Sequence, residues 1–151
     1  MRIFRDRDLE HALEIAMDGH YGQKDHAGEP YILHLHRVME GVREQGFTDN
    51  DYLSAAALHD LLEDTDWTLD RLRGAGIKNE VVAAVWALTH RSDESYGDYV
   101  KRVAKDEIAR IVKIADLRDH LARKDAESFH KFETYKNALS FLSEKCPLAI
   151  L

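Results

Sequence analysis

The chain has 151 residues, of which 44% are hydrophobic and 32% charged, and its 21 basic and 28 acidic side chains give a net charge of −7. This composition excludes a disordered chain, and the acidic balance argues against sequence-independent binding of nucleic acid, which needs a basic surface. The length fits one domain, and we expect residues 1–151 to form a single one.

The expected secondary structure is all-α, with about seven or eight helices. Glycine and proline are scarce, and apolar residues recur at helical spacing along almost the whole chain. In chain order we expect helices at 7–20 and about 31–45, a third from a cap at 48–50 to about 63, a short fourth from Thr68 to Gly74 or Gly76, a fifth capped by Asn79, a sixth starting at Ser95, a seventh capped by Asp106 and a last one capped by Ser128.

The cysteine content and the start of the chain predict a cytoplasmic protein. Cys146 is the one cysteine, so no internal disulfide can form, which favours a reducing compartment. The charged segment 1–8 lacks the apolar run of a signal peptide, and no stretch of about 18 apolar residues predicts a transmembrane helix. We therefore expect no membrane association.

The expected third helix carries a patch of ionisable residues. On a continuous helix His59 lies one turn before Glu63, and Asp60 lies one turn before Glu63 and Asp64. The helix alone leaves two interpretations open: the solvated polar face of an amphipathic helix, or part of a functional site.

Two further polar residues interrupt apolar segments. His34 lies in the apolar start of the second helix, where a histidine is either a hydrogen-bonded core residue or a ligand. Asp116 follows the apolar run 111–115, and a carboxylate there is costly unless it is paired, for example with Lys113, or bound to a metal.

Together these segments offer two imidazoles and two carboxylates, namely His34, His59, Asp60 and Asp116. Such mixed nitrogen and oxygen ligands suit manganese, iron or zinc and leave positions for water and substrate. A metal held there would make a nucleophile of water near neutral pH. Glu63 and Asp64 are placed to orient that water, accept its proton or protonate a leaving oxygen.

The same residues carry a family resemblance. The His59-Asp60 doublet is that of the HD-domain metal-dependent phosphohydrolases, and four strings around it occur in the family's order: His20-Tyr21-Gly22-Gln23, Gly28-Glu29-Pro30-Tyr31-Ile32-Leu33-His34, Ala57-Leu58-His59-Asp60-Leu61-Leu62-Glu63-Asp64-Thr65 and Val112-Lys113-Ile114-Ala115-Asp116. Over roughly residues 9–121 the chain resembles the hydrolase domain of the RelA/SpoT stringent-response enzymes and its small stand-alone relatives. Those proteins remove the 3′-pyrophosphate from (p)ppGpp.

The resemblance implies roles for particular residues. The family's metal ligands fall on His34, His59, Asp60 and Asp116, and its catalytic acidic pair falls on Glu63 and Asp64. Its usual ion is Mn²⁺, with another divalent transition metal as the alternative. We read His36, which lies outside the motif, as structural.

The substrate-recognition half of the motif differs from the family's pattern. In the loop, Asp25, His26 and Ala27 replace an arginine, a lysine and a serine, and Lys24 lies one place early. His120 stands where the family has an asparagine that touches the nucleotide. We take Lys24, His26, Lys113 and His120 as the candidate substrate-binding residues, and we expect Asp25 to weaken binding of an anionic nucleotide.

Three functions remain open from the sequence. The leading one is a Mn²⁺-dependent phosphohydrolase acting on a small phosphorylated nucleotide, with the (p)ppGpp 3′-pyrophosphate as the first candidate. The second is a nucleotidase or phosphatase acting on another nucleotide, such as a nucleoside monophosphate or NADPH. The third is a binding module that senses a nucleotide without turning it over, a function that loss of Glu63 or Asp64 would have favoured.

Overall fold

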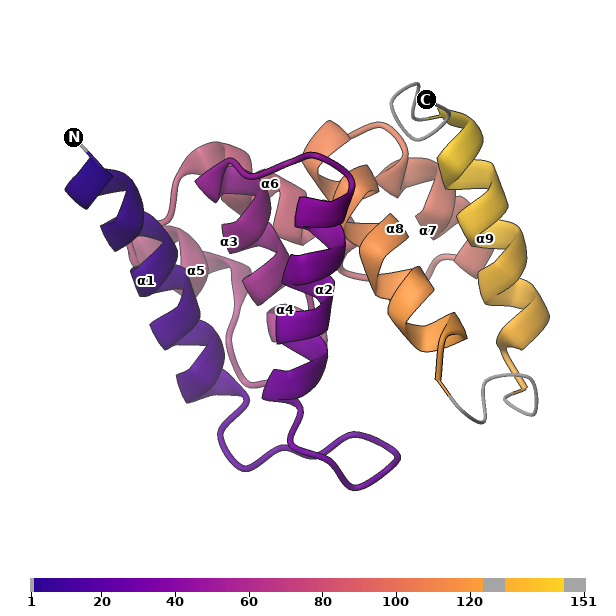
Figure 1. Ribbon diagram of the computed structural model, residues 1–151, viewed down its shortest axis with the longest axis horizontal. Helices are drawn as coiled ribbons and strands as arrows, with labels where there is room; N and C mark the ends of the chain where they lie inside the picture. Colours follow the sequence, from indigo (N-terminus) through magenta and orange to yellow (C-terminus); the bar gives the residue numbers. More distant parts are fainter. Residues whose placement is uncertain (1, 124–129, 146–151) are drawn as a thin grey trace.

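The fold is all-α, as predicted from the sequence (Figure 1). The computed structural model describes residues 2–123 and 130–145. The helices in these two ranges are α1 (Arg2–Gly19), α2 (Ile32–Glu44), α3 (Asn50–Leu58), α4 (Leu61–Asp64), α5 (Leu69–Gly74), α6 (Asn79–Leu88), α7 (Tyr96–Val103), α8 (Glu107–Leu121) and α9 (Phe132–Lys145). None of them is long and apolar enough to cross a membrane.

Several predicted helix starts are confirmed by their caps. The side chains of Thr68, Ser95 and Asp106 accept hydrogen bonds from backbone N–H groups in the first turns of α5, α7 and α8. Asn79 was expected to cap α6 but is its first residue, and Lys78 precedes it without a side-chain cap. The predicted cap Ser128 and the cysteine Cys146 lie outside the described residues.

The predicted third helix is wrong in its extent. Instead of running to about residue 63, α3 ends at Leu58, and the short helix α4 follows after His59 and Asp60. Asp60 has φ −102° and ψ 2°, which departs from helical geometry and turns the chain.

Helix α3 occupies the centre of the fold, packed against α1, α2, α6 and α8. Its residues Ala55, Ala56 and Ala57 are fully buried, and their small side chains let the surrounding helices approach closely. The end of this central helix, where the chain turns at His59 and Asp60, therefore lies inside the protein.

Helices α2 and α8 pack in antiparallel directions at close range. Gly41 of α2 faces Ala115 of α8, and a Cβ atom at position 41 would lie 2.9 Å from the Ala115 Cβ. Where α2 ends and α8 begins, the two helices are joined by Gln45, whose Nε2 donates a hydrogen bond to the carbonyl oxygen of Ile111 at 3.0 Å. The other end of this contact brings His34 of α2 against the last turns of α8.

Candidate metal centre

Four of the predicted side chains, which come from three separate segments of the chain, converge on one place inside the fold. His34 comes from α2, His59 and Asp60 from the turn after α3, and Asp116 from α8. Each offers one ligand atom, and these atoms all lie within 4.8 Å of one another. The side chains of His34, His59 and Asp116 are buried, whereas that of Asp60 is 20% exposed. The cluster is therefore mostly buried, and Asp60 is its member that solvent reaches.

The interruption after α3 lets two adjacent residues face one site. On a continuous helix, neighbouring side chains point about 100° apart, so His59 and Asp60 would diverge. In the structure His59 Nε2 lies 3.1 Å from Asp60 Oδ2 and 3.3 Å from Asp116 Oδ1. Because the helix is interrupted, the side chains of the adjacent residues His59 and Asp60 point to the same site.

The ring of His59 is oriented as a metal ligand requires. Its Nδ1 lies 2.7 Å from the carbonyl oxygen of Ala56, an atom that only accepts, so Nδ1 donates to that oxygen and Nε2 is the nitrogen turned toward the cluster. Nε2 is buried and has no hydrogen-bond partner among the described residues, although carboxylates stand on two sides of it. A buried imidazole nitrogen turned toward two carboxylates fits a divalent cation.

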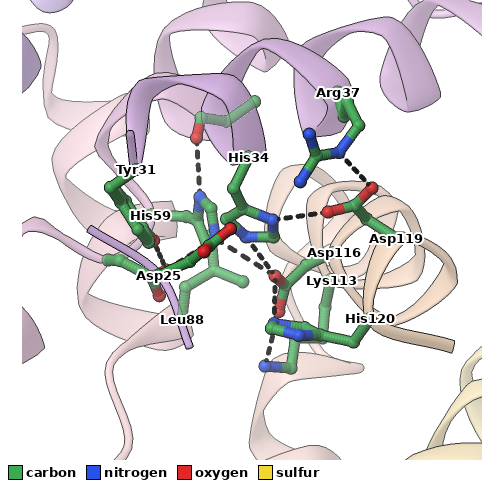
Figure 2. A network of polar contacts seen from close by, with 12 residues as sticks. Asp25, Tyr31, His34, Arg37, His59, Leu88, Lys113, Asp116, Asp119 and His120 are labelled. Atoms are coloured by element: carbon green, nitrogen blue, oxygen red, sulfur yellow. Dashed lines mark hydrogen bonds and ion pairs between the residues drawn. The ribbon is translucent and has the colours of Figure 1, made fainter. Parts of the chain in front are cut away.

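The two carboxylates have unequal surroundings. Asp116 lies 3.0 Å from Lys113 Nζ and 3.3 Å from His120 Nε2 (Figure 2). Burial opposes its ionisation, but Lys113, His120 and His59 hold the pKa of Asp116 well below its usual value. At Asp60, burial followed by the charge of Asp116 raises the pKa well above the usual value. A cation between them would remove that conflict, so the residues present fit a divalent metal.

Comparisons with known proteins agree with this chemistry. No protein-family model matches the chain. It is 30% identical over 149 residues, 94% of its length, to a guanosine-3′,5′-bis(diphosphate) 3′-pyrophosphohydrolase of Aquifex aeolicus, and 32% identical over 145 residues, 89% of its length, to the protein of that name from Haemophilus influenzae. A GTP pyrophosphokinase of Streptomyces coelicolor is 33% identical over 119 residues, 73% of the chain.

Over most of its length the chain is similar to RelA/SpoT-related proteins. It spans 21% of the length of the first and second of these relatives and 14% of the third. A solved structure described as a metazoan ortholog of SpoT that hydrolyzes ppGpp matches with a TM-score of 0.73 at 23% identity, over 95% of this chain and 90% of that one. This likeness establishes that the HD-domain fold extends over nearly the whole chain.

The predicted acidic pair of this HD domain lies on α4, directly after the doublet. The backbone N–H of His90, which follows α6, donates to the Glu63 carboxylate. Desolvation raises the pKa of Glu63 above its usual value, and the charges of both Glu63 and Asp64 act on Asp60. With the helix interrupted, the predicted helical spacing from His59 to Glu63 does not apply, and the printed contact of the Glu63 side chain is the one with His90.

Two of the four candidate substrate-binding residues adjoin the cluster. Lys113 and His120 both contact Asp116, so the pairing of Lys113 with Asp116 that the sequence suggested is present. Lys24 and His26 lie in the exposed loop between α1 and α2, where Lys24 forms an isolated β-bridge with Pro30. The structure thus separates these four residues into an inner pair and a loop pair.

The carboxylate of Asp25 is engaged within its own loop and with Arg123, which follows α8. Its Oδ1 accepts hydrogen bonds from the backbone N–H groups of Ala27 and Glu29, each at 2.9 Å, and its Oδ2 lies 3.7 Å from Arg123. These contacts lower the pKa of Asp25, with the Glu29 N–H as the largest cause. The carboxylate holds the loop together, a role that its charge alone did not reveal, and its effect on nucleotide binding stays a prediction.

Sequence reasoning missed two residues that adjoin the cluster, Tyr31 and Asp119. The hydroxyl of Tyr31 donates to Asp60, and the Tyr31 ring packs on His20 with centroids 4.6 Å apart. Asp119 contacts His34 at 2.7 Å and Arg37 at 2.7 Å (Figure 2). Tyr31 stood within a quoted motif, but its partner lies 29 residues away. Asp119 carried no signal in the sequence, because its partners His34 and Arg37 are on another helix.

Proposed function

We propose that the chain is a metal-dependent phosphohydrolase that uses Mn²⁺ and acts on a phosphorylated nucleotide, with the 3′-pyrophosphate of (p)ppGpp as its substrate group. The observation that carries this proposal is the buried Nε2 of His59, which points toward the Asp60 and Asp116 carboxylates and has no hydrogen-bond partner among the described residues. Imidazole and carboxylate ligands suit Mn²⁺.

The names of the relatives support hydrolysis in particular. Two of the three relatives are named for removing the 3′-pyrophosphate and one for transferring pyrophosphate to GTP. Because this chain spans only 14–21% of their length, the names alone do not tell which of the two activities belongs to the matching segment. The local chemistry favours hydrolysis, because an acidic pair, Glu63 and Asp64, follows the ligand doublet after two leucines. Such groups handle the protons of an attacking water.

In this proposal Glu63 is the general base. A divalent cation held by the four ligands supplies Lewis-acid chemistry that makes water a nucleophile near neutral pH. As the water oxygen attacks phosphorus, Glu63 accepts its proton, and the His90 N–H keeps that carboxylate in place. A raised pKa suits this task, because a base works best when its pKa approaches the operating pH.

The remaining steps assign the leaving group and the phosphate charge. The bond between phosphorus and the ribose 3′ oxygen breaks, and Asp64 directs a proton to that oxygen, so the products are pyrophosphate and GDP or GTP. Lys113 and His120 stand beside Asp116 and neutralise charge on the phosphates. Lys24 and His26 contribute positive or hydrogen-bonding groups from the loop.

One observation keeps a second substrate class in view. The loop that would contact the nucleotide is closed by Asp25 through Ala27 and Glu29, and its side chains differ from the family's basic ones. A loop organised in this way suits another phosphorylated nucleotide, such as a nucleoside monophosphate or NADPH, as the alternative substrate.

The test is a product assay over a nucleotide panel. Purified protein with Mn²⁺ is incubated with ppGpp, pppGpp, NADPH and nucleoside monophosphates, and products are separated by anion-exchange chromatography. We expect pyrophosphate and GDP from ppGpp, and about 10²–10⁴-fold slower release of both with Glu63→Gln, while Glu80→Gln, at an exposed position on α6, serves as the charge-matched control. Orthophosphate from NADPH or a monophosphate would select the alternative. Nucleotide binding without any product would identify a sensor.

A further inference from the structure

His34 uses both of its ring nitrogens, and each meets a different carboxylate. Nε2 faces the candidate metal cluster, 2.9 Å from Asp116 Oδ1, and Nδ1 faces away from it, 2.7 Å from Asp119 Oδ2. The side chain of His34 is 1% exposed and that of Asp119 is 11% exposed. The contact between His34 and Asp119 is therefore almost completely shielded from water.

Asp119 is itself held in place from several directions. Its second oxygen, Oδ1, accepts a hydrogen bond from Arg37 Nε at 2.7 Å, and Arg123 NH2 lies 3.9 Å from Oδ2. Arg37 is one turn after His34 on α2, and Asp119 is one turn after Asp116 on α8. The carboxylate thus bridges the two helices at the level of the cluster, as the dashed lines of Figure 2 show.

The two histidines of the cluster are oriented by different groups. His59 directs Nδ1 at a backbone carbonyl, whereas His34 directs Nδ1 at a carboxylate. A nitrogen that binds a metal must be bare, so the proton of a neutral ligand histidine must sit on its other nitrogen. A carboxylate opposite that nitrogen fixes both the tautomer and the ring orientation and makes the imidazole a stronger donor.

We propose that Asp119 is a positioning residue for the metal centre, which holds His34 with its proton on Nδ1 and its Nε2 aimed at the cation. The inference rests on the proposed metal-dependent function. It assigns Asp119 a task beyond its ion pair with Arg37, and it explains why an acidic side chain occupies this nearly buried place on α8.

Asparagine at position 119 tests this role with little change of shape. The aspartate offers two acceptor oxygens, one to His34 and one to Arg37. Asparagine offers one acceptor and one N–H₂ donor, so one of the two facing N–H groups loses its partner. Arg37→Met is the matched control, because it removes the same ion pair between α2 and α8 while leaving the contact between Asp119 and His34.

The measurement is Zn²⁺ affinity by calorimetry, since Zn²⁺ binds imidazole sites at least as tightly as Mn²⁺ and is diamagnetic. We expect Asp119→Asn to bind Zn²⁺ about 10–100-fold more weakly than wild type, the usual effect of removing such a partner. Arg37→Met should stay within about threefold, because its side chain is 40% exposed and exposed ion pairs contribute little.

A spectroscopic readout separates positioning from general loosening of the fold. In Zn²⁺-loaded wild type, the ¹⁵N–¹H correlation of His34 should show a proton on Nδ1, shifted downfield by its charged acceptor. The signal should move upfield in Asp119→Asn and remain in Arg37→Met. If Asp119→Asn does not fold, Asp119→Ser, which is smaller and neutral, takes its place with the same expectations.

The outcomes distinguish this inference from the proposed function. If wild type binds no Zn²⁺, the metal centre itself is wrong and the role of Asp119 falls with it. If wild type binds Zn²⁺ and Asp119→Asn binds it equally well, or if Arg37→Met weakens binding as much, the metal centre stands and the positioning role of Asp119 is refuted.

Discussion

Lys113→Met should destabilise the metal-free protein, because Lys113 compensates a buried carboxylate. Lys113 Nζ lies 3.0 Å from Asp116 Oδ2, and the two side chains are 12% and 4% exposed. At an effective dielectric of about 20, a charge pair at this distance attracts by roughly 5–6 kcal/mol, and removing one partner of a buried pair typically costs about 3–5 kcal/mol.

The expected cost is smaller than that range because Asp116 keeps other partners. His34 and His120 lie 2.9 and 3.3 Å from its Oδ1, so we expect Lys113→Met to lower the free energy of unfolding by roughly 2–4 kcal/mol. For a chain of this size, that corresponds to a fall in melting temperature of roughly 4–16 °C.

The assay is urea unfolding of metal-free protein, followed by circular dichroism, with Lys101→Met on α7 as an exposed control that removes the same charge. Saturating Mn²⁺ should recover part of the lost free energy of unfolding of Lys113→Met, because a cation at the cluster also compensates the charge of Asp116. A free Mn²⁺ concentration of 100 times the dissociation constant adds about 2.7 kcal/mol to the free energy of unfolding. An unchanged unfolding midpoint for metal-free Lys113→Met would refute the reasoning about this buried pair.

Three further predictions concern catalysis, packing and pH. Glu63→Gln should keep the bound metal but lower turnover about 10²–10⁴-fold. Metal content and product formation are measured on the same sample, and a loss of metal together with turnover would contradict the general-base role. Gly41→Ala should lower the free energy of unfolding by about 1–2 kcal/mol in urea titrations, since its Cβ would lie 2.9 Å from that of Ala115; wild-type stability would mean that α2 and α8 separate without cost. Arg102 lowers the pKa of Glu94 to about 2, so this pair stabilises the fold above a pH of about 4.5 and is lost as the pH falls towards 2; acid titrations should show that Glu94→Gln removes this part of the loss.

The fold class and the ligand set were accessible from the sequence because both depend on local patterns. Apolar spacing predicted helices, and a histidine or an aspartate inside an apolar helix signalled a buried polar site. The break between α3 and α4 was not accessible, since the string from Leu58 to Glu63 fits continuous helical spacing. At the turn, His59 Nδ1 contacts the carbonyl oxygen of Ala56 three residues earlier, and the distant Tyr31 donates a hydrogen bond to Asp60.

The sequence pattern also did not predict the roles of residues whose contacts depend on the folded chain. Asp119 and His34 are 85 positions apart, and their contact depends on how closely Gly41 lets α2 and α8 approach. Asp25 was interpreted from its charge alone, whereas its hydrogen bonds to the loop backbone determine where that charge is directed. In both cases the residue type was visible and the direction of the side chain was not.

The most direct test of the account is the number of Mn²⁺ ions bound per chain, measured by electron paramagnetic resonance of the free ion during titration. The account predicts one ion for wild type, one for Asp70→Asn, whose side chain is 95% exposed, and none at the same concentrations for Asp60→Asn. Equal binding by wild type and Asp60→Asn would contradict the claim that His34, His59, Asp60 and Asp116 form a metal centre.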